Sequence, residues 1–339
     1  MSPSAQMPER QPTAPLLSVD DLRISFRSGT DWVQVVDGAS FDIARGETIG
    51  IVGESGSGKT VTGLSILGLL VPGQARTQGS IRFLGKEING LPESEMRKIR
   101  GRHISMIFQE PMTALDPVFT IGDQIAETLR AHHTISKKEA RERAIEALRQ
   151  VGISLPERRI DEFPHQLSGG MRQRVMIAIA LACEPDLLIA DEPTTALDVT
   201  IQAQIIELLQ ELVQARKTSL IFISHNLGVV SQCCTRMVTM YAGQVVENGP
   251  IDDVLERPYH PYTSGLLRSM PTLAQPGARL PSIGGRVPAP QEMPPGCHFQ
   301  PRCRHAIDDC LSPQPLRQAD DRQARCLRYS ELNLPGVTA

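Results

Sequence analysis

Aromatic residues are scarce in this chain: Phe, Trp and Tyr make up 4% of its 339 residues, and Trp32 is the only tryptophan. Proteins that bind single-stranded nucleic acid stack the bases on aromatic side chains. A basic excess is also missing, since 35 Lys and Arg stand against 38 Asp and Glu, for a net charge of −3. Because binding to phosphate backbones requires a basic face, we expect no nucleic-acid partner.

The sequence also lacks a long apolar run. The longest runs, at residues 65–71 and 175–183, are shorter than the about 18 residues that a membrane-spanning helix needs. Residues 1–16 are rich in proline and polar side chains and contain no apolar signal segment, so we expect a disordered tail there. A role at a membrane would therefore require a partner that spans it.

The order of the apolar stretches predicts an α/β fold. Residues 17–50 alternate as an antiparallel β region would, and residues 47–53 form an apolar run that ends in glycine, as a buried parallel strand does. Two further strands are expected at residues 186–190 and 219–223, with a helix between them. Such strand–helix–strand alternation specifies a parallel sheet covered by helices.

Two segments depart from this alternation. Charged residues and alanine recur at helical spacing between about residues 93 and 174, which predicts a helical insert. After residue 249 proline becomes frequent and the periodicity fades, which predicts a loop-rich C-terminal extension.

Residues 53–60 match the pattern G-x-x-x-x-G-K-[ST] at every fixed position. The motif follows a predicted strand and opens a predicted helix, which is the setting of a phosphate-binding loop. Its backbone N–H groups can surround a phosphate, and the helix N-terminus adds partial positive charge. We expect Lys59 to reach the β- and γ-phosphates and Thr60 to ligate Mg²⁺. The predicted nucleotide-binding residues of this loop are Gly53, Glu54, Ser55, Gly56, Ser57, Gly58, Lys59 and Thr60.

Polar residues end three other apolar runs. Asp191 and Glu192 follow one of them, and because unpaired buried charge is costly, the two carboxylates should face a cation or a reacting group. We expect Asp191 to hold the Mg²⁺ shell and Glu192 to orient or deprotonate the attacking water. Gln109 and His225 end the other two runs. Taken singly, such a glutamine is usually a surface residue and such a histidine is more often structural.

Residues 167–174, Leu-Ser-Gly-Gly-Met-Arg-Gln-Arg, resemble the signature motif of ATP-binding cassette (ABC) ATPases. A serine before two glycines is also a sound helix cap, and a helix N-terminus is itself an anion site. The order of phosphate loop, Gln109, signature, Asp191-Glu192 and His225 is similar to that family as a whole.

The resemblance implies a P-loop NTPase fold of the RecA-like type and an enzyme that hydrolyses ATP with Mg²⁺. It implies that Glu192, His225 and Gln109 are catalytic, and that Mg²⁺ is held through Thr60, Gln109 and Asp191. Two cassettes would meet head to tail, so that each ATP lies between the phosphate loop of one subunit and the signature of the other. The signature residues acting in trans would be Ser168, Gly169, Gly170 and Gln173.

Two more positions match the family. Phe26 matches the aromatic residue that stacks on adenine, although a place in the core of its sheet explains it nearly as well. Asp198 matches a loop that crosses the dimer interface, although alone it would be read as a helix cap. The resemblance thus divides the chain into four parts: the tail, a nucleotide-binding α/β core at 17–94 and 175–249, a helical subdomain with the signature at 95–174, and the extension at 250–339.

Four of the seven cysteines lie in one 30-residue stretch inside the extension. They are Cys297, Cys303, Cys310 and Cys326. Their spacing leaves open a [4Fe–4S] cluster, a structural zinc ion and four free thiols. This block and the stretch Pro-Tyr-His-Pro-Tyr-Thr at residues 258–263 resemble the C-terminal region of ATPases from dipeptide/oligopeptide importers, and that likeness favours the cluster.

The resemblance implies the ATPase subunit of an ABC importer for di- and oligopeptides, bound to the cytoplasmic face of the bacterial inner membrane. Its implied partners are a second ABC ATPase (a sister chain or another copy), two transmembrane permeases and, through the complex, an extracytoplasmic substrate-binding protein. Two alternatives remain: the same role for nickel or another small solute, and a soluble ABC ATPase without a transport role.

Overall fold

The computed structural model of the chain describes residues 14–110, 114–195, 197–270 and 282–337. The tail expected at residues 1–16 therefore lies outside the described residues except for its last three positions. The described chain begins with a four-stranded antiparallel sheet, in the order β2-β1-β4-β5. Its strands are β1 (Leu17–Ser28), β2 (Asp31–Ile43), β4 (Ala75–Phe83) and β5 (Lys86–Glu87). This sheet is the antiparallel β region that the alternating sequence predicts.

An eight-stranded sheet forms the centre of the molecule, in the order β11-β12-β10-β9-β3-β8-β7-β6. Five neighbours, from β9 to β6, run parallel, and β10 to β12 extend one edge antiparallel. The parallel strands are β3 (Thr48–Val52), β6 (Ile104–Ile107), β7 (Leu187–Asp191), β8 (Ser219–Ser224) and β9 (Arg236–Tyr241). Strands β6, β7 and β8 are buried along their whole length, as their continuous apolar sequence requires.

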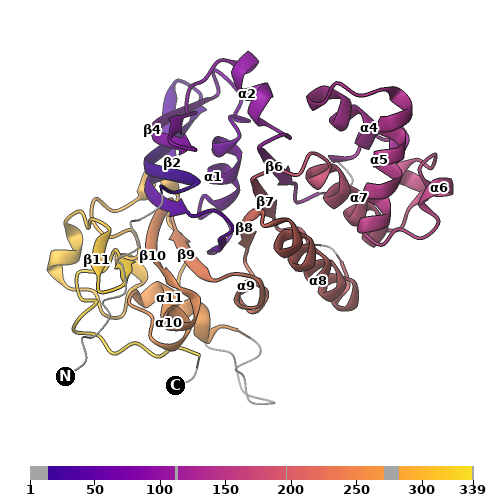
Figure 1. The fold of residues 1–339 in the computed structure, drawn as a ribbon. Helices are drawn as coiled ribbons and strands as arrows, with labels where there is room; N and C mark the ends of the chain where they lie inside the picture. The colour runs from indigo at the N-terminus through magenta and orange to yellow at the C-terminus, as the bar shows by residue number, and fades with distance from the viewer. Residues whose placement is uncertain (1–13, 111–113, 196, 271–281, 338–339) are drawn as a thin grey trace, which may run out of the picture.

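Helices cover this sheet and form a separate lobe. Helix α1 (Lys59–Ile66) follows β3, α8 (Val199–Arg216) joins β7 to β8, and α9 (Leu227–Cys233) follows β8. Figure 1 shows the lobe to one side of the strands. It contains α4 (Ile121–His132), α5 (Lys137–Gln150), α6 (Pro156–Arg159) and α7 (Gly169–Leu181). Among the residues described, no helix is long and apolar enough to cross a membrane.

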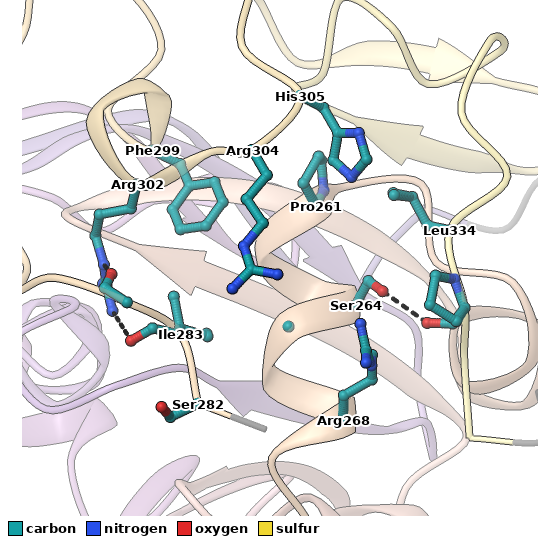
Figure 2. A pocket seen from close by; sticks show the side chains of 13 residues that line it. Pro261, Ser264, Arg268, Ser282, Ile283, Phe299, Arg302, Arg304, His305 and Leu334 are labelled. Atoms are coloured by element: carbon teal, nitrogen blue, oxygen red, sulfur yellow. Dashed lines mark hydrogen bonds between the residues drawn. The ribbon is translucent and has the colours of Figure 1, made fainter. Parts of the chain in front are cut away.

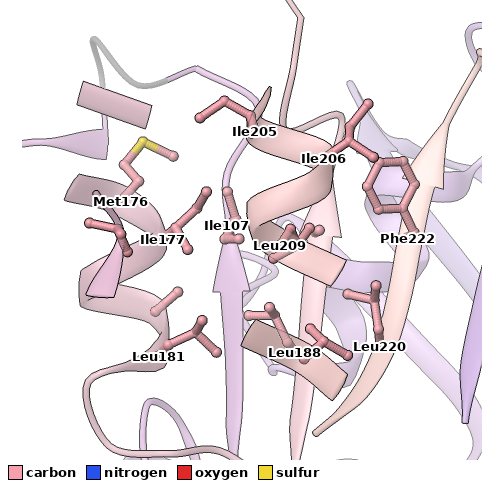
Figure 3. Close-up of a cluster of buried hydrophobic side chains, with 14 of the residues drawn as sticks. Ile107, Met176, Ile177, Leu181, Leu188, Ile205, Ile206, Leu209, Leu220 and Phe222 are labelled. Carbon is pink, nitrogen blue, oxygen red and sulfur yellow. The ribbon is translucent and has the colours of Figure 1, made fainter. Parts of the chain in front are cut away.

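Two elements cross the boundaries that the sequence predicts for the helical subdomain at 95–174. Strand β6 lies inside that range but pairs with β7 in the central sheet. Four apolar residues are too few for periodicity to separate a strand from a helix, which explains the difference. Helix α7 starts at the signature and continues past residue 174 to Leu181. Figure 3 shows its residues Met176, Ile177 and Leu181 in the same cluster as Ile205 and Leu209 of α8, so one core joins the lobe to the sheet.

The C-terminal extension packs on the far edge of the central sheet. Strand β10 (Gln244–Pro250) is followed by α10 (Ile251–Glu256) and α11 (Pro261–Arg268), and the chain returns as β11 (Arg317–Ala319) and β12 (Arg322–Ala324). Strand β12 pairs with β10, so the extension adds two strands to the sheet. These three-residue strands have no sequence signature. An aromatic cluster of Tyr241, Tyr262 and Phe299 joins the extension to β9.

Candidate nucleotide site

The carboxyl ends of the parallel strands place the predicted site residues along one edge of the sheet. The phosphate loop follows β3, Gln109 follows β6, Glu192 follows β7 and His225 follows β8. In open α/β sheets this edge is where ligands bind. Because the strands lie in the order β3-β8-β7-β6, the row across the sheet runs from the phosphate loop through His225 and Glu192 to Gln109.

The phosphate loop has a backbone that only glycine supports at its critical positions. Gly53 has φ 154° and Gly58, which caps α1, has φ 96°. A Cβ atom on Gly53 would lie 2.2 Å from the carbonyl oxygen of Met240. Lys59 is buried, and its Nζ donates to the carbonyl oxygens of Gly53 at 2.8 Å and Glu54 at 3.0 Å. Burial lowers the pKa of Lys59, and the nearby carboxylates of Glu192, Asp191 and Glu54 oppose that shift.

Thr60, the last residue of this loop, contacts Asp191 at the end of β7. The Thr60 hydroxyl donates to Asp191 Oδ1 at 3.1 Å, although 131 residues separate them in the sequence. Asp191 is only 2% exposed. Burial raises the pKa of Asp191 to about 6, the Thr60 hydrogen bond opposes this, and the charge of Glu192 adds to it. A buried carboxylate beside a hydroxyl is a donor set that suits a hard cation such as Mg²⁺.

Glu192 is the centre of the predicted catalytic residues. Gln109 Nε2 donates to its Oε2 at 3.0 Å, and His225 Nδ1 lies 3.0 Å from its Oε1. The Thr195 hydroxyl also donates to Oε2, at 2.9 Å. Burial opposes ionisation of Glu192, but the hydrogen bonds from His225 and Thr195 outweigh it and lower the pKa. The structure therefore brings Gln109, Glu192 and His225 together around an ionised carboxylate.

The signature lies away from this row. Ser168 caps α7, and its hydroxyl accepts a hydrogen bond from the Met171 amide at 3.3 Å. Ser168 and Gly169 are exposed and Gly170 is half-buried, whereas Gln173 is 1% exposed. In Figure 1, α7 lies with α4 and α5 on the other side of β6 from α1. Within one chain, the signature does not meet the phosphate loop.

The two remaining predicted contacts are at element ends. Phe26 lies in β1, half-buried, and packs against the core cluster of the N-terminal sheet. Asp198 is the N-cap of α8, where its Oδ1 accepts a hydrogen bond from the Ile201 amide at 2.9 Å. Val199 beside it is 83% exposed. Phe26 thus packs against the core of its sheet and Asp198 caps a helix, which are the structural alternatives that the sequence leaves open.

The four cysteines of the extension line one small cavity of about 20 Å³. Burial raises the pKa of Cys297 to about 11 and that of Cys326 to about 12, and the neighbouring cysteines add to both shifts. Burial therefore favours the protonated thiol at Cys297 and Cys326. No group of three or more His, Cys, Asp or Glu within residues 14–337, leaving aside the undescribed positions, has the spacing of a metal site. The structure thus gathers the predicted ligands without forming the predicted metal centre.

Sequence reasoning missed three residues that hold this site. Thr195 had a signal, since a threonine three residues after Glu192 in a turn can reach back to it. Tyr262 and Arg302 had none, because they come from the extension. The Tyr262 hydroxyl accepts a hydrogen bond from the Glu54 amide at 2.8 Å, and Arg302 pairs with the Glu54 carboxylate at 2.7 Å.

Comparison with known proteins identifies the family. The family described as "ABC transporter" matches residues 36–195, and "Oligopeptide/dipeptide transporter, C-terminal region" matches residues 246–310. The oligopeptide transport ATP-binding protein AppD of Bacillus subtilis is 52% identical over 93% of this chain and 97% of its own length. The dipeptide transport ATP-binding protein DppD of Escherichia coli is 48% identical over 92% of this chain and 96% of its own length.

Solved structures agree with this assignment. The dimeric structure of MJ0796, a bacterial ABC transporter cassette, matches with a TM-score of 0.62 at 29% identity, over 69% of this chain and 98% of that one. The same cassette matches in a post-hydrolysis state bound to ADP and Pi, with the same TM-score. The chain therefore belongs to the ABC transporter family, as an ATPase subunit that carries the C-terminal region of the oligopeptide/dipeptide transporters.

Proposed function

We propose that this chain hydrolyses ATP to ADP and phosphate and thereby energises the import of di- and oligopeptides. The observation that carries the proposal is the Glu192 carboxylate, held by Gln109, Thr195 and His225 beside the Thr60–Asp191 pair. The peptide cargo rests on the C-terminal family match and on relatives named for dipeptide and oligopeptide transport. Nothing comparable supports nickel, another small solute or a soluble role.

The residues around the loop suit a nucleotide bound with Mg²⁺. Lys59 and the N–H groups of residues 53–60 would hold the phosphates, and Phe26 would stack on the adenine. Thr60, Asp191 and Gln109 would hold Mg²⁺, which neutralises phosphate charge when bound. Glu192 would take a proton from the attacking water, because its lowered pKa keeps it ionised at neutral pH. His225 would act with it near the γ-phosphate.

A second ATPase subunit would complete each site. The separation of α7 from α1 within the chain supports this arrangement, and so does the likeness to a dimeric cassette. Ser168, Gly169 and Gly170 would then face the partner's nucleotide, with Asp198 at the interface. Gln173 would have to become accessible, since it is 1% exposed in the isolated chain. We favour a sister chain as the partner over a second copy.

The remaining partners belong to the membrane complex. Phe108, Val118 and Phe119, which lie within ten residues of Gln109 in the sequence, are 41%, 71% and 51% exposed. Large exposed apolar side chains of this kind mark interaction sites. We infer that two transmembrane permeases dock there and recruit an extracytoplasmic substrate-binding protein, which places the chain at the cytoplasmic face of the inner membrane.

Peptide uptake by proteoliposomes tests the function. Vesicles with the full complex should accumulate peptide only when MgATP is supplied on the ATPase side, with release of phosphate. The variant Lys59→Ala should abolish ATP binding and both activities. Uptake that persists with Lys59→Ala, or phosphate release that peptide transport does not follow, would refute this function.

We also propose that Cys297, Cys303, Cys310 and Cys326 hold a [4Fe–4S] cluster. The support is that four thiols, the number such a cluster takes, line one cavity. Binding would require the thiols to lose their protons and to approach one another. Anaerobically purified chain should contain iron and sulfide in a near 1:1 ratio and absorb in the visible range. Stoichiometric zinc, or four thiols that titrate freely in folded protein, would rule the cluster out.

A further inference from the structure

A partly buried ion pair joins the C-terminal extension to the phosphate loop. Arg302 Nη1 lies 2.7 Å from Glu54 Oε2, and Arg302 Nη2 lies 3.1 Å from Glu54 Oε1. The Arg302 side chain is 5% exposed and that of Glu54 is 29% exposed. A two-pronged contact of this kind fixes the carboxylate in both position and orientation. The second residue of the phosphate loop is thus held by a residue 248 positions later.

Arg302 is itself held from several directions. Its Nε donates to the carbonyl oxygen of Gly284 at 2.9 Å, and its Nη1 lies 3.3 Å from the Tyr241 hydroxyl. Figure 2 shows the side chain at the edge of a cavity, beside Phe299 and with a hydrogen bond to the Ile283 carbonyl oxygen. Only the planar, five-donor guanidinium can make these contacts together, so lysine is not equivalent here.

A second contact fixes the backbone of the same residue. The hydroxyl of the fully buried Tyr262 accepts a hydrogen bond from the Glu54 amide at 2.8 Å. Its ring packs on Tyr241 and Phe299, with centroids 4.6 and 5.5 Å away. Both the side chain and the main chain of Glu54 are therefore held by the extension, from α11 and from the segment that ends at Arg302.

The electrostatics give this contact a consequence for nucleotide binding. The charge of Glu54 acts at Lys59, where it opposes the lowering of the lysine pKa by burial. A free carboxylate beside the loop would repel the triphosphate, and in a partly buried site such repulsion is poorly screened. Arg302 offsets this charge and holds the carboxylate in one position through two contacts.

We infer that Arg302 is a positioning residue of the nucleotide site, through which the extension sets the affinity for ATP. The inference rests on the proposed binding of ATP at the phosphate loop. Arg302 immediately precedes Cys303, whose side chain lines the cysteine cavity. The extension therefore contacts the phosphate loop through Arg302, next to the cysteine cavity, and through Tyr262.

The test is a double-mutant cycle on the purified full-length chain, with the dissociation constant of MgATP as the readout. Arg302→Met should weaken ATP binding about tenfold when Glu54 is present, and less than about threefold in the Glu54→Gln background. This dependence on the background is a readout that a general loss of stability would not produce. Arg328→Met is the control, because Arg328 lies in the same extension but pairs with Glu331.

Two results would overturn the inference: unchanged ATP affinity in Arg302→Met, or an equal loss in both backgrounds. If Arg302→Met does not fold, Arg302→Lys replaces it, and it should weaken binding by a smaller factor that again depends on Glu54. Lys59→Ala separates the two proposals, because wild-type affinity in that variant would refute the phosphate loop itself and not the Arg302 link alone.

Discussion

At the scale of the residue, the candidate site contains two neighbouring carboxyl groups whose surroundings shift their pKa values in opposite directions. Burial raises the pKa of Asp191 to about 6, whereas hydrogen bonds from His225 and Thr195 overcome burial and lower that of Glu192. Adjacent carboxyl groups with opposite shifts are typical of sites in which each has its own role. The environment of Asp191 is that expected of a cation ligand, and the environment of Glu192 is that expected of a base that accepts a proton from water.

Changing Glu192→Gln should leave MgATP binding within a few fold and lower phosphate release by about 10²-fold or more, because the amide cannot take a proton. Phosphate release by the assembled complex measures this. Glu211→Gln, an exposed change on α8, is the matched control and should release phosphate at the wild-type rate. Near-normal turnover in Glu192→Gln would contradict the assignment.

Asp191 gives the nucleotide-free chain a specific pH dependence. The Asp191 carboxyl has a pKa of about 6 in the folded chain and an ordinary value of 3.8. Between these two pH values the folded chain therefore keeps a proton that the unfolded chain has lost. The stability gained at low pH is therefore lost as the pH rises through about 6. Asp191→Asn removes the ionisable group, so it should raise the free energy of unfolding, relative to wild type, by roughly 1–3 kcal/mol more at pH 8 than at pH 5.

Denaturant unfolding without nucleotide at these two pH values measures that difference. The same variant should gain less thermal stability from MgATP than the wild type does, because the cation loses its carboxylate. An Asp191→Asn effect that is identical at pH 5 and pH 8 would show that the carboxyl titrates normally.

At the scale of the element, the structure has the strands that the sequence predicts at β3, β7 and β8, and it adds short or remote features that the sequence does not predict. The phosphate loop, Asp191, Glu192 and His225 could be predicted as site residues because each stands at the end of an apolar run of the sequence. Strand β6 was missed because it has four residues. The Arg302–Glu54 pair was missed because no local pattern relates residues so far apart.

Helix caps carry part of the stability at this scale. Asp198 caps α8 by accepting a hydrogen bond from the Ile201 amide. Asp198→Ala should lower the free energy of unfolding by about 1 kcal/mol, whereas Asp198→Asn should cost much less, because asparagine caps equally well. Denaturant unfolding of the isolated chain measures both. Equal losses in the two variants would mean that the cap does not explain Asp198.

A role of Asp198 at the subunit interface would appear in a different measurement. If the charge contacts the partner, both Asp198→Ala and Asp198→Asn should reduce phosphate release by the assembled complex. Under that hypothesis the two variants differ in the stability of the isolated chain but lose similar activity in the complex. Full activity in Asp198→Asn would leave the helix cap as the role of this residue.

At the scale of the whole molecule, the two proposed halves of the nucleotide site lie apart, with the phosphate loop after β3 and the signature at the start of α7. The lobe that carries α7 shares a core with α8, so the signature and the strand edge are parts of one continuous packing unit. A nucleotide bridging two such molecules would join the loop of one to the lobe of the other. Hydrolysis would remove that bridge and release the lobe with its exposed apolar residues.

The most direct test is the mass of the ATPase assembly in solution. Glu192→Gln chain, mixed with its partner ATPase subunit, should form a dimer by light scattering when MgATP is added and should dissociate with MgADP. Lys59→Ala chain should stay monomeric under both conditions. A mass that does not change between MgATP and MgADP would contradict the claim that ATP is shared between two subunits.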